Sequence, residues 1–265
     1  MAYAEILRAR RALSIYAIVI GGIVAITLLS WFLSGAQHAI HLDGSGAIVH
    51  VDQNGRHVSH MGQEAIPFSV LVLGAAYFAT IIASIVGSWL SSERAHISQA
   101  WTKPISREGF ALSYMAVDVV TALCAFAIFL FAECFTLWAI GLGTLIHFDS
   151  DVLSLGLLGL GFTFAYYGVV RSLGVAFGRG GLIAGISWPI GFVLAGLAAV
   201  RLPWVLHDII LVLNFINPIA YLTGFTGERS ASVLPIPFEA RVACEWLLAV
   251  ITTAASVVIW KRLED

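Results

Sequence analysis

The chain has 265 residues, of which 59% are hydrophobic and 11% are charged, and its formal net charge at pH 7 is −2. Soluble domains carry about 45–50% apolar and about 25% charged residues, so this composition excludes a soluble protein and requires lipid around the chain. The hydrophobic runs leave no room for a separate soluble domain, and the slightly acidic balance gives no support for a nucleic-acid partner.

Six hydrophobic runs are long enough to cross a membrane, which takes about 20 apolar residues for about 30 Å of hydrocarbon. We predict one membrane-spanning helix from each, over residues 13–34, 66–90, 110–137, 152–177, 182–200 and 240–260. The third run continues to about residue 146, and Glu133, Gly141 and Gly143 interrupt it. We therefore expect a long third helix that bends or emerges near its outer end. The predicted fold class is an all-α polytopic membrane protein with a single transmembrane domain over residues 1–265.

The distribution of lysine and arginine predicts the orientation. With the N-terminus in the cytoplasm, nine of these residues fall at the inner side of the membrane and four at the outer side. Cytoplasmic loops carry the excess of positive charge, so we predict that both termini lie in the cytoplasm.

The segment before the first span, residues 3–11, mixes Ile6 and Leu7 with Glu5 and three arginines. We predict a short amphipathic helix on the inner membrane surface, with its arginines near anionic head groups. The alternative is a basic flank that only orients the first span.

The outer loop, residues 35–65, contains five of the eight histidines and a hairpin signal. Asn54 and Gly55 form a two-residue turn signal between alternating stretches, which predicts a β-hairpin over residues 48–59.

Three side chains of this hairpin could bind a metal ion. The predicted turn pairs Asp52 with His57 and His50 with Ser59. Residues two apart share a face of a strand, so His50, Asp52 and His57 would lie on one side. Two histidines and one carboxylate could hold a transition metal with an open position. The simpler interpretation, which we favour, is a half-buried hairpin with a polar outer face.

The predicted cytoplasmic loop after the second span covers residues 91–109. An acidic and a basic residue, Glu93 and Arg94, follow soon after the second span. Pro104 is poorly tolerated inside a helix, and Ser106 is a good residue to begin one. We therefore expect a short amphipathic helix, a turn, and the start of the third span.

Four ionisable residues lie within the predicted spans: Asp118, Glu133, Arg171 and Glu245. Such residues are costly in lipid and usually face a partner or a wet cavity. Asp118, Glu133 and Arg171 are candidates for a substrate or proton path. The alternative is structural, with Arg171 paired to an acid of a neighbouring helix. Glu245 is close to the start of the last span, and we interpret it as interfacial.

The segment before the last span, residues 201–239, is apolar but contains four prolines, Pro203, Pro218, Pro235 and Pro237. Irregular backbone at membrane depth persists only when it is buried in protein or lines a cavity. We predict a pair of short re-entrant or interfacial helices here and no seventh crossing.

Three short stretches resemble the type-two ATP-binding-cassette (ABC) exporter permeases. In that family, a Glu after the second span leads into a coupling helix and a Pro-Ile-Ser-Arg turn, which residues 93–107 resemble. Residues 213–221 resemble the family's Asn-Pro-x-x-Tyr stretch, and residues 260–265 its basic-acidic terminus. The chain departs from the family at Ala95-His96, where many members carry Gly-Thr.

The resemblance implies the permease subunit of an ABC transporter in a bacterial plasma membrane. Two copies, or two related chains, would each receive a cytoplasmic ABC ATPase subunit that binds ATP and Mg. ATP-driven closure of the ATPase pair would push the coupling helix. The residues that the resemblance assigns to ATPase coupling are Glu93, Arg94, Trp101, Lys103, Pro104 and Arg107.

The sequence agrees with this scheme on one point. A P-loop ends in Gly-Lys-Ser/Thr, but the only lysines are Lys103 and Lys261, and neither follows a glycine. We therefore expect no catalytic residues and no cofactor in this chain. The alternative function is a stand-alone proton-coupled secondary transporter that uses Asp118 or Glu133.

Overall fold

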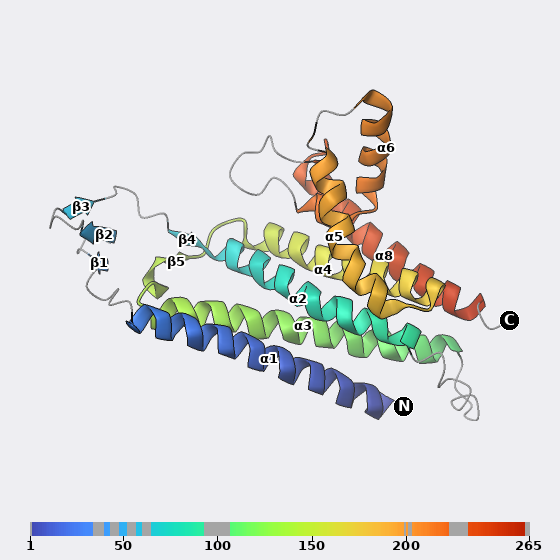
Figure 1. Ribbon diagram of the computed structural model, residues 1–265, viewed down its shortest axis with the longest axis horizontal. Coiled ribbons are helices and arrows are strands. Elements are labelled where there is room, and N and C mark those ends of the chain that lie inside the picture. The colour runs from blue at the N-terminus through green and yellow to red at the C-terminus, as the bar shows by residue number, and fades with distance from the viewer. Residues whose placement is uncertain are drawn as a thin grey trace.

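The computed structural model describes residues 2–33, 40–42, 48–51, 57–59, 65–92, 107–198, 200, 203–222 and 233–262. Six of its helices are long and apolar enough to cross a membrane. They are α1 (Ala2–Leu33), α2 (Phe68–Ser92), α3 (Arg107–Ala139), α4 (Val152–Phe177), α5 (Gly180–Ala198) and α8 (Phe238–Arg262). The prediction of an α-helical polytopic membrane protein with six spans is confirmed, and Figure 1 shows these helices gathered in one bundle.

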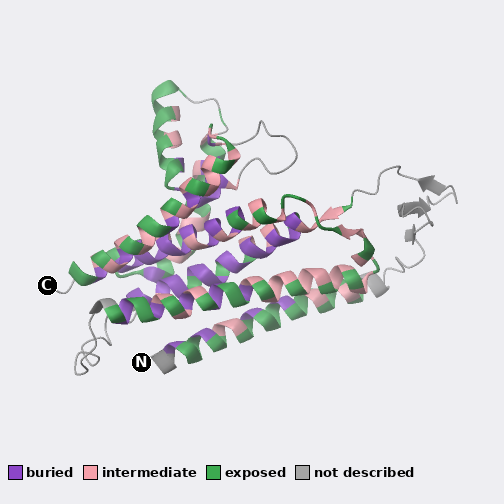
Figure 2. Ribbon diagram, turned by 180° about the vertical axis from the view of Figure 1, so that it is seen from behind, coloured by how far each residue is buried: buried purple, intermediate pink, exposed green. Residues whose placement is uncertain are grey.

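Helices α2 and α4 form the centre of the bundle, where most of the buried residues lie (Figure 2). The α2 face toward α4 carries the small residues Ala76 and Thr80, which are fully buried, and the Thr80 hydroxyl donates to that of Thr163 in α4 at 3.1 Å. Opposite them in α4, a Cβ atom added to Gly159 would lie 2.7 Å from the Cβ of Ala76. Small residues let two backbones approach closely, which is how apolar helices associate in lipid.

Helix α1 is a single helix of 32 residues that includes the predicted surface segment, residues 3–11. The predicted N-terminal helix is therefore continuous with the first span. No glycine or proline interrupts the sequence before Gly21, so nothing ends the helix between the two parts. Glu5, Ala9 and Tyr16 are buried on the side of α1 that faces the bundle.

The third membrane-spanning helix ends close to residue 137, where its end was predicted. Helix α3 has 33 residues, continues through Glu133 without a break and ends at Ala139. Only the glycines interrupt the run, because Gly141 adopts a left-handed φ of 81°. A short 3₁₀ helix, η4 (Gly143–Leu145), and the strand β5 (Ile146–His147) follow.

Strand β5 pairs in parallel with β4 (Ile66–Pro67), which leads into α2. Beside this pair, the backbone N–H of Ser69 donates to Oδ1 of Asp149 at 3.1 Å. A carboxylate at a helix N-terminus satisfies one of its free N–H groups. The connection after α3 therefore holds the first turn of α2.

The segment between α1 and α2 contains an antiparallel sheet of β1 (Ile40–Leu42), β2 (Ile48–Val51) and β3 (His57–Ser59). Its register pairs His50 with Val58 and Val51 with His57, so the predicted pairing of His50 with Ser59 is wrong by one residue. Positions 50 and 57 then lie on opposite faces of the sheet.

The cause of this shift is the position of β2 in the sheet. β2 is the central strand and pairs with β1 as well as with β3, so its register is not set by one turn alone. Asp52 and the predicted Asn54-Gly55 turn lie outside the described residues. This register therefore does not give positions 50 and 57 the shared face that was predicted for them.

Two short helices precede the last span, as predicted: α6 (Trp204–Phe215) and α7 (Pro218–Tyr221). The 12 residues of α6 extend about 18 Å, which is too short to cross about 30 Å of hydrocarbon. In Figure 1, α6 stands out from the bundle beside α5.

Candidate functional site

A buried ion pair joins α3 and α4. Nη1 of Arg171 lies 3.2 Å from Oδ2 of Asp118, and the two side chains are 0% and 3% exposed. Nη2 of Arg171 donates to the Ala111 carbonyl at 2.7 Å, and the Tyr167 hydroxyl donates to Oδ2 of Asp118 at 2.8 Å. Arg171 Nη1 also donates to the Tyr167 hydroxyl oxygen. We call these four residues the Arg171 network.

The geometry of the network follows from helix spacing. Tyr167 and Arg171 are four residues apart and so share one face of α4. Ala111 and Asp118 are seven residues apart, which places them two turns apart on one face of α3. Buried charges require a partner and hydrogen bonds, and here each charge has both. This pairing agrees with the alternative interpretation of Arg171 as a structural residue that pairs with an acid of a neighbouring helix.

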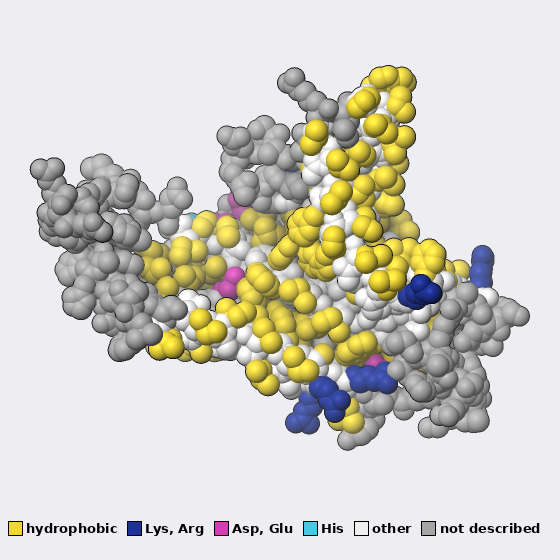
Figure 3. Space-filling model, in the orientation of Figure 1, with side chains coloured by type: hydrophobic (Ala, Val, Ile, Leu, Met, Phe, Trp, Pro, Cys, Tyr) yellow, Lys and Arg dark blue, Asp and Glu magenta, His cyan; other side chains and the backbone are white. Residues whose placement is uncertain are grey.

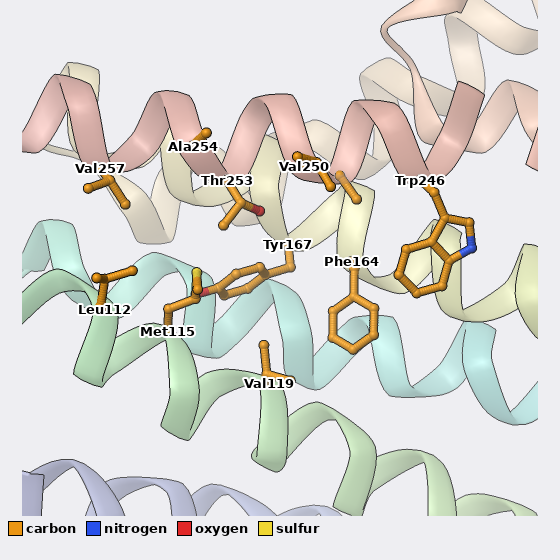
Figure 4. Close-up of a pocket in the computed structure, with 11 residues that line it drawn as sticks. Leu112, Met115, Val119, Phe164, Tyr167, Trp246, Val250, Thr253, Ala254 and Val257 are labelled. Carbon is orange, nitrogen blue, oxygen red and sulfur yellow. The ribbon is translucent and has the colours of Figure 1, made fainter. Parts of the chain in front are cut away.

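An apolar groove of about 490 Å³ lies beside the network, between α3, α4 and α8. Figure 4 shows the Tyr167 ring in the middle of the groove, between Met115 of α3 and Thr253 of α8. Tyr167 therefore belongs both to the groove and to the network. Near one end of the groove, Trp246 Nε1 donates to the Leu157 carbonyl at 2.9 Å, which fixes the ring against α4.

Glu133, the third predicted pathway residue, is far from this network along α3. It lies on a separate cavity of about 270 Å³ between α1, α2 and α3. One of its carboxylate oxygens, Oε2, is buried without a hydrogen-bond partner. The structure thus brings Asp118 and Arg171 together and leaves Glu133 apart from both.

Glu245, the fourth ionisable residue of the predicted spans, is inside the protein and not at its surface. Its side chain is completely buried on α8, and its Cγ lies 3.5 Å from the position that a Cβ on Gly161 of α4 would take. Neither carboxylate oxygen has a hydrogen-bond partner. The closer neighbour of that position is Trp246, whose Nε1 lies 3.1 Å from it, so the missing side chain of Gly161 leaves room for the Trp246 ring.

Four helix ends meet next to the predicted coupling loop. Most of its residues, including Glu93, Arg94, Trp101, Lys103 and Pro104, lie outside the described residues, and Arg107 is described only as the first residue of α3. The flanks of the loop, the end of α2 and the start of α3, are described, and both take part in one packed cluster. We call this the end cluster: Leu90, Phe110, Ala111, Tyr114, Val175 and Trp260.

Aromatic rings hold the end cluster together. The rings of Phe110 and Trp260 stack with centroids 6.2 Å apart, and those of Phe110 and Tyr114 lie 4.6 Å apart. Aromatic side chains bury large areas and hold specific orientations. The ends of α2, α4 and α8 and the start of α3 are thereby fixed to one another.

Helix α5 begins at this same end of the bundle. Gly178 ends α4 in a left-handed conformation with φ of 66°, and the Gly180 N–H donates to the Ser91 hydroxyl oxygen of α2 at 2.9 Å. The end of α2 and the start of α3, which flank the predicted coupling loop, are therefore next to helix ends that are themselves held together.

The Asn-Pro-x-x-Tyr stretch forms a compact unit around α7. The side-chain oxygen of Asn217 accepts from the Ile219 N–H at 3.2 Å and so caps α7, and Pro218 follows at the first helical position. The Tyr221 hydroxyl donates to the Phe215 carbonyl at 2.8 Å. Asn217 Nδ2 also donates to the Gly191 carbonyl of α5 at 2.9 Å, so the stretch is fixed to a membrane-spanning helix.

Sequence reasoning missed two features of these sites. The Tyr167 hydroxyl in the Arg171 network could have been predicted, because Tyr167 and Arg171 are four residues apart on one helix and so share a face. No sequence signal marked Gly74 of α2, which lies against Glu133. Over the residues whose side chains are described, no group of three or more His, Cys, Asp or Glu could hold a metal ion.

Positive charge gathers at one end of the bundle (Figure 3). We call it the basic end, and its described members come from the start of α1, the connection between α4 and α5, and the end of α8: Arg8, Arg10, Arg11, Arg179, Lys261 and Arg262. The start of α1 and the end of α8 both lie there (Figure 1). At the opposite end, the first turn of α8 carries Arg241.

Fold and composition together define the class of the protein, a multi-pass α-helical membrane protein. Comparison of the chain with family models, with curated proteins and with solved structures finds no match. Its function must therefore be inferred from its own residues.

Proposed function

We propose that the chain is the permease subunit of an ABC transporter, an exporter of the plasma membrane that receives its energy from a separate ATPase subunit. The proposal starts from the resemblance of residues 93–107, 213–221 and 260–265 to the type-two ABC permeases. The lack of a P-loop is consistent with it, because the ATPase would be another chain.

The single observation that carries the proposal is the end cluster. The coupling loop leaves α2 three residues after Leu90 and enters α3 three residues before Phe110, and both side chains are buried in the cluster. A force on the loop would therefore act at once on α2 and α3, and through Val175 and Trp260 on α4 and α8. A coupling element requires such a rigid connection, since packed cores shift between discrete arrangements and transmit strain.

Charge supports the orientation that this role requires. Cytoplasmic ends of membrane proteins carry the excess of lysine and arginine, and the coupling loop leaves and re-enters the bundle at the basic end. With that end in the cytoplasm, both termini and the loop would face an ATPase. The apolar groove beside Tyr167 suits a hydrophobic or amphipathic export substrate.

A second candidate function, a stand-alone proton-coupled transporter, is favoured by Glu133. A proton carrier needs an acid that reaches a cavity and is not neutralised by a fixed cation. Asp118 does not fit, because Arg171 holds it in an ion pair. Glu133 does fit, because it lines a cavity and its Oε2 has no hydrogen-bond partner.

Affinity purification of the tagged full-length chain from its own cells tests the leading proposal. We expect a subunit with a P-loop to co-purify in stoichiometric amount. The double variant Glu93→Gln with Arg107→Gln should lose most of it, because both charged groups of the proposed contact are neutralised. The matched control is Asp151→Asn with Arg56→Gln, which changes the same charges in the predicted outer connections and should retain the subunit. Purification without an ATPase, or equal recovery with both double variants, would contradict the coupling assignment.

A further inference from the structure

The cavity at Glu133 combines an apolar wall with three polar groups. It lies between α1, α2 and α3, and the side chains of Ile20, Leu71 and Phe129 form part of its wall. Its polar members are Glu133 and two threonines, Thr27 of α1 and Thr136 of α3. Glu133 is six residues before the end of α3, which is about 9 Å along the helix axis. The cavity is therefore at the opposite end of the bundle from the basic end.

All three polar groups offer hydrogen-bond acceptors to the cavity. The Thr27 hydroxyl donates its proton to the Ile23 carbonyl at 2.9 Å, and the Thr136 hydroxyl donates to the Ala132 carbonyl at 2.7 Å. Because each hydroxyl has one proton, only its lone pairs remain for a ligand. An ionised carboxylate is an acceptor only. A ligand that satisfies this cavity must bring donors.

Within the described part of the chain, no cation or donor satisfies Glu133. Its Oε2 is buried without a hydrogen-bond partner. Its Oε1 lies 3.1 Å from the point where a Cβ on Gly74 would stand, so the carboxylate packs against the backbone of α2 in the space of a missing side chain. Backbone N–H groups inside a helix are already bonded within the helix and cannot serve the carboxylate.

We propose that this cavity binds a small primary or secondary ammonium compound with an apolar body. The ammonium would donate to Glu133 and to a threonine oxygen, and the body would lie on Phe129 and Leu71. The volume of about 270 Å³ is slightly below the range of about 300–1,000 Å³ that ligand sites occupy, which limits the ligand to a small molecule or one end of a larger one. The proposal concerns binding alone and holds with or without an ATPase partner. If the chain is an exporter permease, it names cationic amphiphiles as a substrate class.

Equilibrium binding of radiolabelled 2-phenylethylamine near neutral pH tests the proposal. The full chain is placed in phosphatidylcholine nanodiscs, and empty nanodiscs give the background from partition into lipid. We expect saturable binding that unlabelled 2-phenylethylamine displaces. The neutral 2-phenylethanol should not displace it, and the N,N,N-trimethyl derivative, a cation without N–H groups, should displace it weakly. No saturable binding, or equal displacement by the alcohol, would overturn the proposal.

Variants at Glu133 locate the site. Glu133→Gln keeps the shape and removes the charge, and we expect a loss of affinity on the order of thirtyfold, since one partner of a buried charge pair is removed. This variant also removes an unpartnered carboxylate, so its thermal stability without ligand should be no lower than that of the wild type. The matched control is Glu239→Gln, an exposed acid in the first turn of α8, which should bind as the wild type does.

Gly74→Ala adds a second, independent variant. Its methyl carbon would stand 3.1 Å from Oε1, which is closer than ordinary contact, so the carboxylate must move by a few tenths of an ångström, and we expect weaker binding although Glu133 is retained. Wild-type affinity in both Glu133→Gln and Gly74→Ala would remove the site from this cavity.

Discussion

Gly180 at the start of α5 lies against Ser88 of α2, so close that a Cβ atom on Gly180 would stand 2.9 Å from the Cα of Ser88. The contacting atom belongs to the backbone, which cannot change rotamer to relieve the contact as a side chain can. Gly180→Ala should therefore destabilise the protein by about 1–3 kcal/mol, the usual effect of overpacking. The free energy of SDS-induced unfolding in mixed micelles measures it.

The next residue supplies the control for this variant. Nothing lies within 4 Å of a Cβ added to Gly181. Gly181→Ala should be neutral or stabilise by up to about 1 kcal/mol, because alanine favours a helix more than glycine does. Equal losses from both alanines would mean that α5 does not approach α2 as closely as described.

Removal of one charge of the Arg171 network should be more harmful than removal of both. Arg171→Met leaves Asp118 buried without its cation, and we expect a loss of about 3–5 kcal/mol in the free energy of unfolding. In the double variant with Asp118→Asn, the loss should be smaller than that of Arg171→Met alone. Arg179→Met, at an exposed arginine, should change the free energy by less than about 0.5 kcal/mol. A double variant that loses the sum of the two single effects would show that the pair does not interact.

Two functions of Asn217 can be separated by substitution. Asn217→Ala removes the cap of α7 and both amide donor bonds, to Gly191 and Asn214, so we expect a loss of about 2 kcal/mol. Asn217→Ser keeps a capping oxygen and loses only the donor, so its loss should be about half. Hydrogen exchange of the α6 and α7 amides measures the effect where it should appear. If serine and alanine give the same exchange, the cap contributes nothing.

The contact between Asp149 and α2 predicts a pH dependence. Hydrogen bonds from Ser69, first from its side chain and then from its backbone N–H, lower the pKa of the half-buried Asp149 carboxyl. A lowered pKa in the folded state means that the charged form stabilises the fold. This effect is complete above the unfolded-state pKa of about 3.9 and is lost as the pH falls through the lowered value.

Thermal midpoints of Asp149→Ala and the wild type should therefore differ near neutral pH and converge in acid. The exposed Asp208 of α6 provides the control, and Asp208→Ala should follow the wild type at every pH. A constant difference for Asp149→Ala across this range would assign its effect to packing and not to the charge.

Except for the start of α1, the bounds of the membrane-spanning helices could be predicted from the sequence, because lipid imposes a length and breakers mark the ends. Gly141 ended the third run as expected, and the prolines of residues 201–239 kept that segment from forming a full span. The local structure at Asn217 and Pro218 also depends on their own side chains, because Asn217 caps α7 and Pro218 fits its first helical position.

Which face of each helix turns inward could not be predicted. In a soluble protein the polar face shows the outside, but lipid and a membrane protein core are equally apolar, so the signal is absent. For this reason the sequence did not indicate which of the acids in the other spans pairs with Arg171, and Asp118 could not be singled out. For the same reason the burial of Glu245 could not be predicted, because nothing in the sequence marks which face of α8 turns toward α4.

The most direct test of the permease proposal is ATP hydrolysis by the purified chain and its co-purified partner in nanodiscs. We predict that the chain alone hydrolyses no ATP, that the complex does, and that Glu93→Gln with Arg107→Gln lowers the rate at least tenfold, equivalent to about 1.4 kcal/mol. The outer control, Asp151→Asn with Arg56→Gln, should keep the wild-type rate. Hydrolysis by the chain alone, or an undiminished rate in the complex with the coupling-loop variant, would contradict the account.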